Sequence, residues 1–162
     1  MKQEIERRFL VADPAALGDW PAQRLVQGYL SRDPGRTVRL RLSTDEQGCE
    51  RGWLTVKGPT RLEAGACVRT EWEVELPPAE VRAGLALCLP SLLEKTRLRV
   101  EHAGHVWEVD VFQGANAGLV LAEIELEGPD ESFATPPWLG EEISADPRYS
   151  NACLSDTPWN RW

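Results

Sequence analysis

Apolar and charged residues alternate with a period of two in seven segments of this chain. The segments are Glu-Ile-Glu-Arg-Arg-Phe (4–9), Val-Arg-Leu-Arg-Leu (38–42), Thr-Val-Lys (55–57), Arg-Thr-Glu-Trp-Glu-Val-Glu (69–75), Lys-Thr-Arg-Leu-Arg (95–99), Trp-Glu-Val-Asp-Val (107–111) and Ala-Glu-Ile-Glu-Leu-Glu (122–127). A β-strand points successive side chains to opposite faces, so each segment has one apolar and one charged face. With the turn residues between them, these segments predict strands at 3–10, 25–32, 37–43, 52–57, 68–76, 95–101, 106–112 and 120–127.

Eight antiparallel strands are enough to close a barrel whose interior holds side chains or one small ligand. We therefore predict a mainly β fold (α+β), a single domain over residues 1–162 built on a closed eight-stranded antiparallel β-barrel with a charged lumen. A few helices are expected outside it, at a turn near 14–18 and in a segment between Pro77-Pro78 and Pro90. The stretch 58–67 is expected to be a loop, and the tail after Gly128 to cover one mouth or the outside of the sheet.

The predicted barrel is inverted relative to the usual one, because its apolar faces point outward. The helices and the tail must then cover these outward side chains: Ile5, Leu40, Val56, Trp72, Val74, Leu98, Val109 and Ile124. The charged faces supply about ten carboxylates to the lumen: Glu4, Glu6, Glu71, Glu73, Glu75, Glu108, Asp110, Glu123, Glu125 and Glu127. About eight Arg and Lys side chains alternate along the same strands.

Composition removes several classes of function. The net charge of −8 and the pI of about 4.9 argue against a nucleic-acid surface, which would carry a basic patch. No apolar run approaches the roughly 20 residues of a membrane span, and no apolar leader opens the chain, so we expect a cytoplasmic protein. The four scattered cysteines are interpreted as idle thiols, and His102 and His105 as hairpin-turn residues.

The charged lumen itself indicates a ligand. Burying an ion costs several kcal/mol even after relaxation, so a purely structural core would be more stable with Val and Leu. The alternative is a water-filled lumen crossed by compensating salt bridges. Arg and Lys match phosphate oxygens, whereas clustered Glu and Asp match a hard divalent cation such as Mg²⁺ or Mn²⁺. Both together favour a metal–polyphosphate complex, and no Gly-rich nucleotide-binding loop is present.

The ordered motifs resemble those of the CYTH superfamily, the triphosphate tunnel metalloenzymes. Glu4-x-Glu6-x-Arg8 is similar to the family's N-terminal signature. The remaining matches run along the whole chain: Gln27-Gly28-Tyr29-Leu30, Arg39-x-Arg41, Thr55-Val56-Lys57-Gly58, Glu71-x-Glu73, Glu94-Lys95-Thr96-Arg97, Asp110-Val111-Phe112, Glu123-x-Glu125, Pro137-Trp138-Leu139-Gly140-Glu141-Glu142 and Asp146-x-Arg148-Tyr149-x-Asn151. The last two look like the ending of short bacterial members.

The resemblance implies a metal-dependent triphosphatase that hydrolyses inorganic tripolyphosphate by attack of water on a terminal phosphoryl group. It implies Mg²⁺ or Mn²⁺ as cofactor, a small polyanionic substrate, no nucleic-acid or membrane partner, and a monomer or homodimer. The implied metal ligands are Glu4, Glu6, Asp110, Glu123 and Glu125. The implied substrate-binding residues are Arg39, Arg41, Lys57, Arg69, Lys95 and Arg97. The implied catalytic residues are Arg8, Glu71, Glu73 and Lys95, the two glutamates serving a second metal or the attacking water.

One departure leaves the activity open. The family's signature lysine is Arg8 here, a wider cation that stays charged at working pH. The exchange is either conservative or it impairs catalysis and leaves a non-catalytic module that binds polyphosphate and metal. The enzymatic alternatives are a nucleoside or thiamine triphosphatase. A class IV adenylyl cyclase is disfavoured because the His-Phe element near the N-terminus of those enzymes is missing. For Tyr29 and Tyr149, packing in the wall is favoured over contact with substrate.

Overall fold

A computed structural model describes all 162 residues. Eight long or medium strands form the wall of a barrel: β1 (Lys2–Val11), β2 (Ala22–Asp33), β3 (Arg36–Asp45), β4 (Glu50–Lys57), β6 (Ala66–Leu76), β7 (Leu93–His102), β8 (His105–Phe112) and β9 (Val120–Glu125). Two short strands, β5 (Arg61–Glu63) and β10 (Leu139–Glu142), and two α-helices, α1 (Pro78–Leu85) and α2 (Asn151–Asp156), complete it. Short 3₁₀ turns lie at Pro14–Leu17, Gly114–Asn116, Pro147–Tyr149 and Trp159–Arg161.

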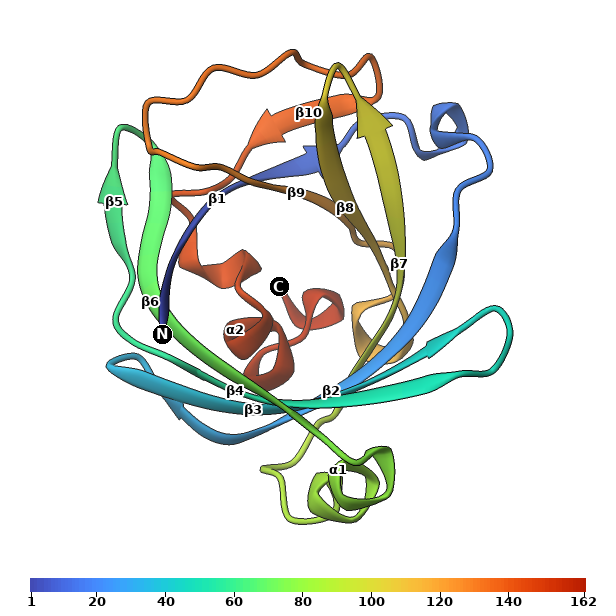
Figure 1. Ribbon diagram of the computed structural model, residues 1–162. Helices are drawn as coiled ribbons and strands as arrows, with labels where there is room; N and C mark the ends of the chain where they lie inside the picture. The colour runs from blue at the N-terminus through green and yellow to red at the C-terminus, as the bar shows by residue number, and fades with distance from the viewer.

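The strands close into one antiparallel barrel, which confirms the predicted fold class. Their order is β1-β9-β8-β7-β2-β3-β4-β6, and β6 pairs back with β1 from Lys2↔Glu71 to Glu6↔Cys67. β10 and β5 extend the sheet beyond β1 and β6. Figure 1 looks along the barrel, with the strands forming a ring and α1 lying outside it. Closure matters for the site because it turns the charged faces of the seven wall strands other than β2 toward one space.

Apolar side chains pack on the outside of this ring, as the inverted pattern predicts. One cluster, with Ile5, Val109 and Ile124 at its centre, lies in the outer face of β1, β8 and β9. It is covered by the segment that carries Phe133 and Trp138. Trp72 is an exception, because it was expected to be covered and is 48% exposed. The prediction fails there because α1 packs farther along, on β3 and β4.

Helix α1 covers the outer face of β3 and β4 and depends on a glycine. Val81 and Leu85 of the predicted stripe are buried against Leu40 and Leu42. A Cβ atom added at Gly52 would lie 2.6 Å from Cγ2 of Val81 and 3.0 Å from a backbone oxygen. Such distances are shorter than van der Waals contact, so the helix reaches β4 only because residue 52 has no side chain.

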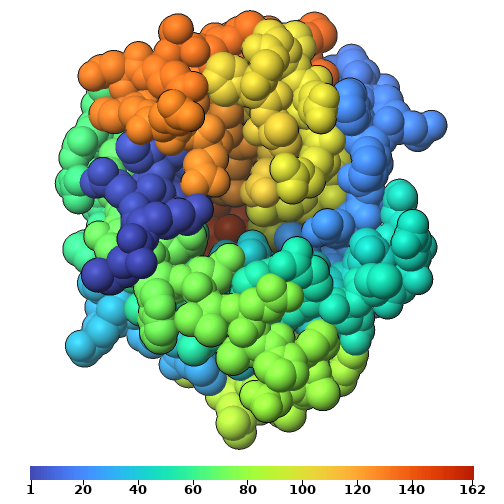
Figure 2. Space-filling model, viewed as in Figure 1, coloured from blue at the N-terminus to red at the C-terminus, as the bar shows by residue number.

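The far end of the lumen is apolar, which the charge pattern did not predict. Leu93, Phe112 and Leu121 pack there with Ile143 and with Leu154 of α2. In Figure 1, α2 and the C-terminus lie within the outline of the ring, and in Figure 2 C-terminal residues are seen at the bottom of an opening. The tail therefore covers one mouth with α2 and the outside of the wall with its earlier part, so both placements weighed for it are found.

Local differences from the predicted elements are small. The β7–β8 hairpin turns at Ala103 and Gly104, which both have positive φ, as a two-residue type I′ turn needs. The predicted loop at 58–67 contains β5, which pairs with β6. No helix is both long enough and apolar enough to cross a bilayer.

Candidate functional site

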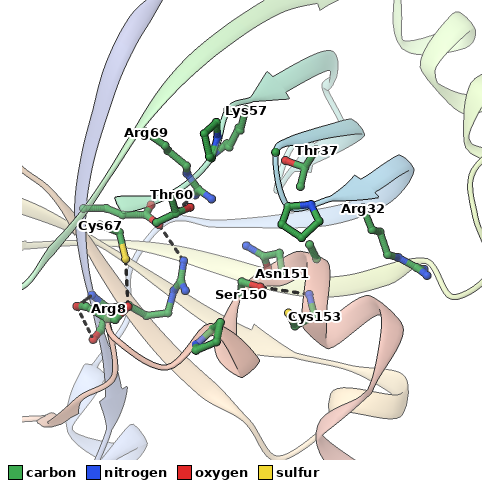
Figure 3. A pocket seen from close by; sticks show the side chains of 18 of the residues that line it. Arg8, Arg32, Thr37, Lys57, Thr60, Cys67, Arg69, Ser150, Asn151 and Cys153 are labelled. Carbon is green, nitrogen blue, oxygen red and sulfur yellow. Dashed lines mark hydrogen bonds and ion pairs between the residues drawn. The ribbon is translucent and has the colours of Figure 1, made fainter. Parts of the chain in front are cut away.

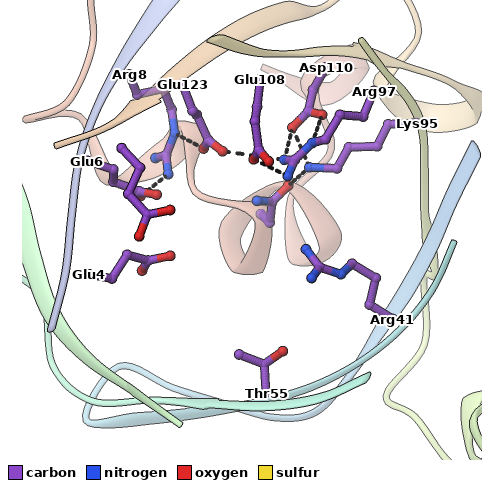
Figure 4. Close-up of polar contacts among 12 residues, drawn as sticks. Glu4, Glu6, Arg8, Arg41, Thr55, Lys95, Arg97, Glu108, Asp110 and Glu123 are labelled. Atoms are coloured by element: carbon purple, nitrogen blue, oxygen red, sulfur yellow. Dashed lines mark hydrogen bonds and ion pairs between the residues drawn. The ribbon is translucent and has the colours of Figure 1, made fainter. Parts of the chain in front are cut away.

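The lumen contains a charged cavity of about 490 Å³ with a single hydrophobic residue in its lining. The strands bring charged side chains to it from all sides, because residues in register on neighbouring strands share one face (Figure 4). We call this space the charged cavity. Its lining residues are Lys2, Glu4, Glu6, Arg39, Arg41, Lys57, Arg69, Glu71, Glu73, Arg97, Arg99, Gly104, His105, Val106, Glu108, Glu123, Glu125, Glu127, Glu131 and Asn151.

The acidic side of the cavity starts at β1. Glu4 accepts from Lys57 at 2.6 Å through Oε1 and from Arg69 through Oε2, while Arg69 also reaches Glu6 at 3.1 Å. Burial raises the pKa of Glu4, but the charges of Lys57 and Arg69 outweigh it and lower the pKa to about 2. Burial and the like charge of Glu123 raise the pKa of Glu6. Glu6 therefore lies where one more positive charge would stabilise the carboxylate.

Arg8 bridges two of the predicted metal ligands. Its Nη2 donates to Glu6 at 2.8 Å and its Nε donates to Glu123 at 2.7 Å. The side chain is buried, and its backbone N–H donates to the Ser144 hydroxyl at 2.9 Å. Burial works against ionisation of Glu123, but the charges of Arg8, Lys95 and Arg97 hold its pKa well below its usual value. The planar fork of arginine makes this double contact geometrically simple.

Asp110, Lys95 and Arg97 form a second ion-pair cluster between β7 and β8. Asp110 accepts from Arg97 Nε and Nη2, both at 2.7 Å, and from Lys95 Nζ at 2.5 Å. Both Asp110 oxygens are thus engaged, and neither Asp110 nor Lys95 lines the charged cavity. Lys95 also donates to Asn151 of α2 at 3.1 Å. Burial lowers the pKa of Lys95 to about 8 even though Asp110 raises it.

Opposite these acids, Arg39 and Arg41 lie on β3. Both side chains carry a buried Nε with no hydrogen-bond partner in the protein. Burial, together with the charge of Arg39, lowers the pKa of Arg41 to about 10. Arg41 Nη2 lies 3.4 Å from Glu73 and Arg39 Nη2 lies 3.7 Å from it. Both arginines therefore line the charged cavity with one buried donor still unpaired.

The remaining predicted residues lie nearer the open mouth. Glu71 is buried and pairs with Lys57 at 3.0 Å, and Lys2 lies 3.5 Å from it. Lys2 also donates to Glu125 at 2.9 Å, and the Glu125 side chain is 61% exposed. Glu75 was expected in the lumen and is not there: it pairs with Arg51 outside the cavity, at 2.8 Å. The strand continues its alternation past the region where the barrel encloses a space.

A second cavity of about 550 Å³ adjoins the first at the α2 end (Figure 3). The two share Glu6, Arg39, Lys57, Arg69 and Asn151, so they adjoin at these five side chains. We call the second one the α2-end cavity. The charge pattern does not predict this cavity, because most of the residues that it adds are uncharged and come from short turns, strands and α2: Tyr29, Pro34, Gly35, Thr37, Gly58, Pro59, Thr60, Leu62, Cys67, Ser144, Ala145, Pro147, Ser150, Ala152 and Cys153. Arg8, Arg32 and Asp146 also line it.

The two tyrosines differ in place. Tyr29 is buried and lines the α2-end cavity, where burial raises its pKa. Tyr149 packs against Trp159 and Trp162, with ring centroids 6.2 and 4.9 Å away, and lines neither cavity. Tyr149 thus packs within the C-terminal segment, whereas Tyr29 belongs to the wall strand β2 and lines the α2-end cavity.

Comparison with known proteins gives the family. A model of the CYTH domain matches residues 2–152. The chain belongs to the CYTH family. It is 37% identical over 163 residues to a protein named inorganic triphosphatase from Acetivibrio thermocellus, with 100% of this chain and 99% of that protein aligned. It is 36% identical over 155 residues to a protein of the same name from Nitrosomonas europaea, with 94% and 96% aligned.

A solved structure supports the same assignment. The crystal structure of the inorganic triphosphatase NE1496 matches with a TM-score of 0.64 at 33% identity, covering 96% of this chain and 95% of that chain. The resemblance inferred from the motifs is confirmed for the family and for the barrel.

Membership of the CYTH family implies a divalent metal in general terms. The donor chemistry fits a hard cation, because Glu4, Glu6 and Glu123 offer only carboxylate oxygens. The raised pKa of Glu6 points the same way, since a nearby added cation would favour its ionised form. The arrangement is not preassembled, however: no three His, Cys, Asp or Glu side chains form a group that could hold a metal ion, and each of these three carboxylates is bound to Arg or Lys. Binding a metal would exchange some of those contacts.

Proposed function

We propose that this protein is a metal-dependent hydrolase of inorganic tripolyphosphate. The observation that carries the proposal is the charged cavity, where carboxylates from β1 and β9 face arginines and lysines from β3, β4, β6 and β7 within one enclosed space. A polyphosphate and a divalent cation together match both kinds of side chain. The name inorganic triphosphatase, carried by two relatives that align along nearly the whole chain, supports the same substrate.

The arginine and lysine side chains of the lumen would bind the phosphate chain. We assign this role to Arg39, Arg41, Lys57, Arg69 and Arg97, which all line the charged cavity, and to Lys95 behind them. A buried donor without a partner costs about 1–3 kcal/mol, and phosphate oxygens would satisfy the free Nε atoms of Arg39 and Arg41. Asp110 is better suited to holding Lys95 and Arg97 in place than to binding metal, because all its oxygens already accept hydrogen bonds.

The acidic side would hold the metal. We assign Glu4, Glu6 and Glu123 as its ligands, with Glu125 at the exposed mouth as an outer contact and Mg²⁺ or Mn²⁺ as the ion. When bound, such an ion neutralises phosphate charge and polarises a phosphoryl oxygen. Arg8 keeps Glu6 and Glu123 a fixed distance apart through its two hydrogen bonds.

Hydrolysis needs a positioned water and little else from the protein. Glu73 is the candidate to orient that water, because its hydrogen bonds and ion pairs all fall on Oε2 and leave Oε1 for a hydrogen bond from water. Glu71, two residues before Glu73 on the same face of β6, would help to orient the water. Water attacks the terminal phosphorus, the bond to the bridging oxygen breaks, and orthophosphate and pyrophosphate result. Arg8 and Lys95 would offset the negative charge, so catalysis consists of positioning and charge neutralisation.

The α2-end cavity favours a second candidate, the hydrolysis of triphosphate esters. Its additional lining is mostly uncharged, so it has room for the organic group of a nucleoside or thiamine triphosphate whose phosphates lie in the charged cavity. Orthophosphate release from tripolyphosphate, ATP and thiamine triphosphate, each with Mg²⁺ or Mn²⁺, separates the candidates. The proposed function predicts the highest kcat/KM for tripolyphosphate. If the protein binds tripolyphosphate tightly but releases orthophosphate from none of the three compounds, it is instead the non-catalytic binding module suggested by Arg8 in place of the signature lysine.

A further inference from the structure

Thr55 links the basic and acidic sides of the charged cavity although it does not line either cavity. The strand register places Arg39 on β3 opposite Thr55 on β4, and Thr55 opposite Glu73 on β6. Residues directly opposite on neighbouring antiparallel strands share one face, so the three side chains form a row across the barrel wall. Figure 4 shows Thr55 directed from the wall toward the lumen.

The hydroxyl of Thr55 contacts both of its neighbours in the row. Its Oγ1 donates to Oε2 of Glu73 at 2.6 Å and accepts from Nη2 of Arg39 at 3.2 Å. The direct separation of Arg39 and Glu73 is longer, 3.7 Å, so the hydroxyl provides the tighter connection. Thr55 is fully buried, and a β-branched side chain has few χ1 choices, so the hydroxyl has a fixed direction.

The contacts leave selected atoms of both neighbours free. On Glu73, every hydrogen bond and ion pair falls on Oε2, which leaves Oε1 without a partner. On Arg39, the buried Nε has no partner, and the residue lines both cavities. The Thr55 hydroxyl thus holds one polar atom of each neighbour and leaves another polar atom of each side chain unpaired.

We propose that Thr55 is a positioning residue that sets the orientation of Glu73 and Arg39 together, so that one hydroxyl aligns the group that orients water with a group that grips phosphate. The inference rests on the proposed function. A residue that only fills the wall would need its volume and not its hydroxyl. The test therefore changes the hydroxyl at nearly constant shape.

The experiment compares Thr55→Val, Thr55→Ser and Thr96→Val in tripolyphosphate hydrolysis, with calorimetric tripolyphosphate binding beside it. Thr96 is the matched control, because it is a strand threonine whose hydroxyl accepts from Gln113 at 3.0 Å and lines neither cavity. We expect Thr55→Val to lower kcat by about tenfold or more, as a charge-assisted hydrogen bond is lost, and to raise KM through Arg39. Thr55→Ser should restore most of both, and Thr96→Val should match the wild type.

Two results would overturn the inference. In one, Thr55→Val keeps wild-type kcat and KM. In the other, Thr55→Ser is impaired as much as Thr55→Val, which would show that the methyl group and not the hydroxyl matters. If Thr55→Val does not fold, Thr55→Ala removes the hydroxyl in its place. Failure of the proposed function looks different: the wild type itself then does not hydrolyse tripolyphosphate, whether or not it binds it, and the role given to Thr55 falls with it.

Discussion

The pKa values of the buried carboxylates in this barrel depend on their charged neighbours as well as on their burial. Glu4, Glu6 and Glu123 are all buried or nearly so, yet burial and neighbouring charges move the pKa of Glu6 up and those of the other two down. Alternation along a strand identifies which side chains face inward, and it correctly places these three. It cannot tell which inward residues end up beyond the enclosed space, as Glu75 does, or become fully ion-paired, as Asp110 does.

Glu4→Gln tests the metal role at this scale. An uncharged amide is a much poorer ligand for a hard cation, so tripolyphosphate turnover should fall to background. Metal-free binding of tripolyphosphate should persist or tighten slightly, because one carboxylate that repels the anion is neutralised. Phosphate release and calorimetry measure the two effects. Glu75→Gln, which changes the same group outside the cavity, is the control and should behave as wild type. Turnover retained by Glu4→Gln would remove Glu4 from the metal site.

Arg39→Ala tests the phosphate role. Losing a charge-assisted contact in a shielded cavity should weaken tripolyphosphate binding by roughly 1.5–3 kcal/mol, with or without metal. Calorimetry in the presence and absence of Mn²⁺ measures this. Arg51→Ala, which removes an exposed arginine paired with Glu75, should leave the affinity unchanged. A loss confined to the metal-loaded protein would contradict the assignment.

At the scale of elements, the sequence predicts strands well and the closing helix poorly. The period of two fixes both the existence and the inward face of each wall strand, and a slip by one residue would reverse the face. The sequence of α2 gives no comparable signal, because the helix has only six residues. Its place is set by contacts with β2 and β7. Its position at the barrel end also explains why the deep lumen is apolar there.

Arg32→Ala tests how α2 is held. Arg32 of β2 donates to Ser155 Oγ at 3.0 Å, to Asp156 at 3.0 Å and to the backbone oxygens of Pro90 and Ser155. Removing these contacts should lower the free energy of unfolding by about 1–3 kcal/mol and speed amide exchange at 151–156. Arg24→Ala removes an exposed pair with Glu94 and should do neither. Unchanged exchange in Arg32→Ala would mean that the packing of Leu154 and the hydrogen bonds from Lys95 and Asn116 hold the helix without Arg32.

In the whole molecule, closing the charged strands into one barrel buries charges close together, whereas water would hydrate the same charges on an open surface. The barrel, its inversion and the charged cavity could be predicted, because all three follow from the alternation. The α2-end cavity could not, since turns, strands and α2, far apart in the sequence, build it mostly from uncharged residues that show no alternation.

A ligand that binds only the folded barrel should stabilise it. At a free concentration 100 times the dissociation constant, the gain is about 2.7 kcal/mol. Thermal melts with Mg²⁺, with tripolyphosphate and with both measure it, and the combination should raise the midpoint most. An unchanged midpoint at millimolar concentrations of both would argue against a polyphosphate site.

A crystal structure of the protein with Mn²⁺ and a non-hydrolysable tripolyphosphate analogue would show both proposed sites at once, with the anomalous signal locating the metal. We expect a Mn²⁺ peak in the charged cavity within coordination distance of Glu4, Glu6 and Glu123, and phosphate density along Arg39, Lys57 and Arg69. Metal or phosphate bound only outside the barrel, with the internal ion pairs undisturbed, would contradict this expectation.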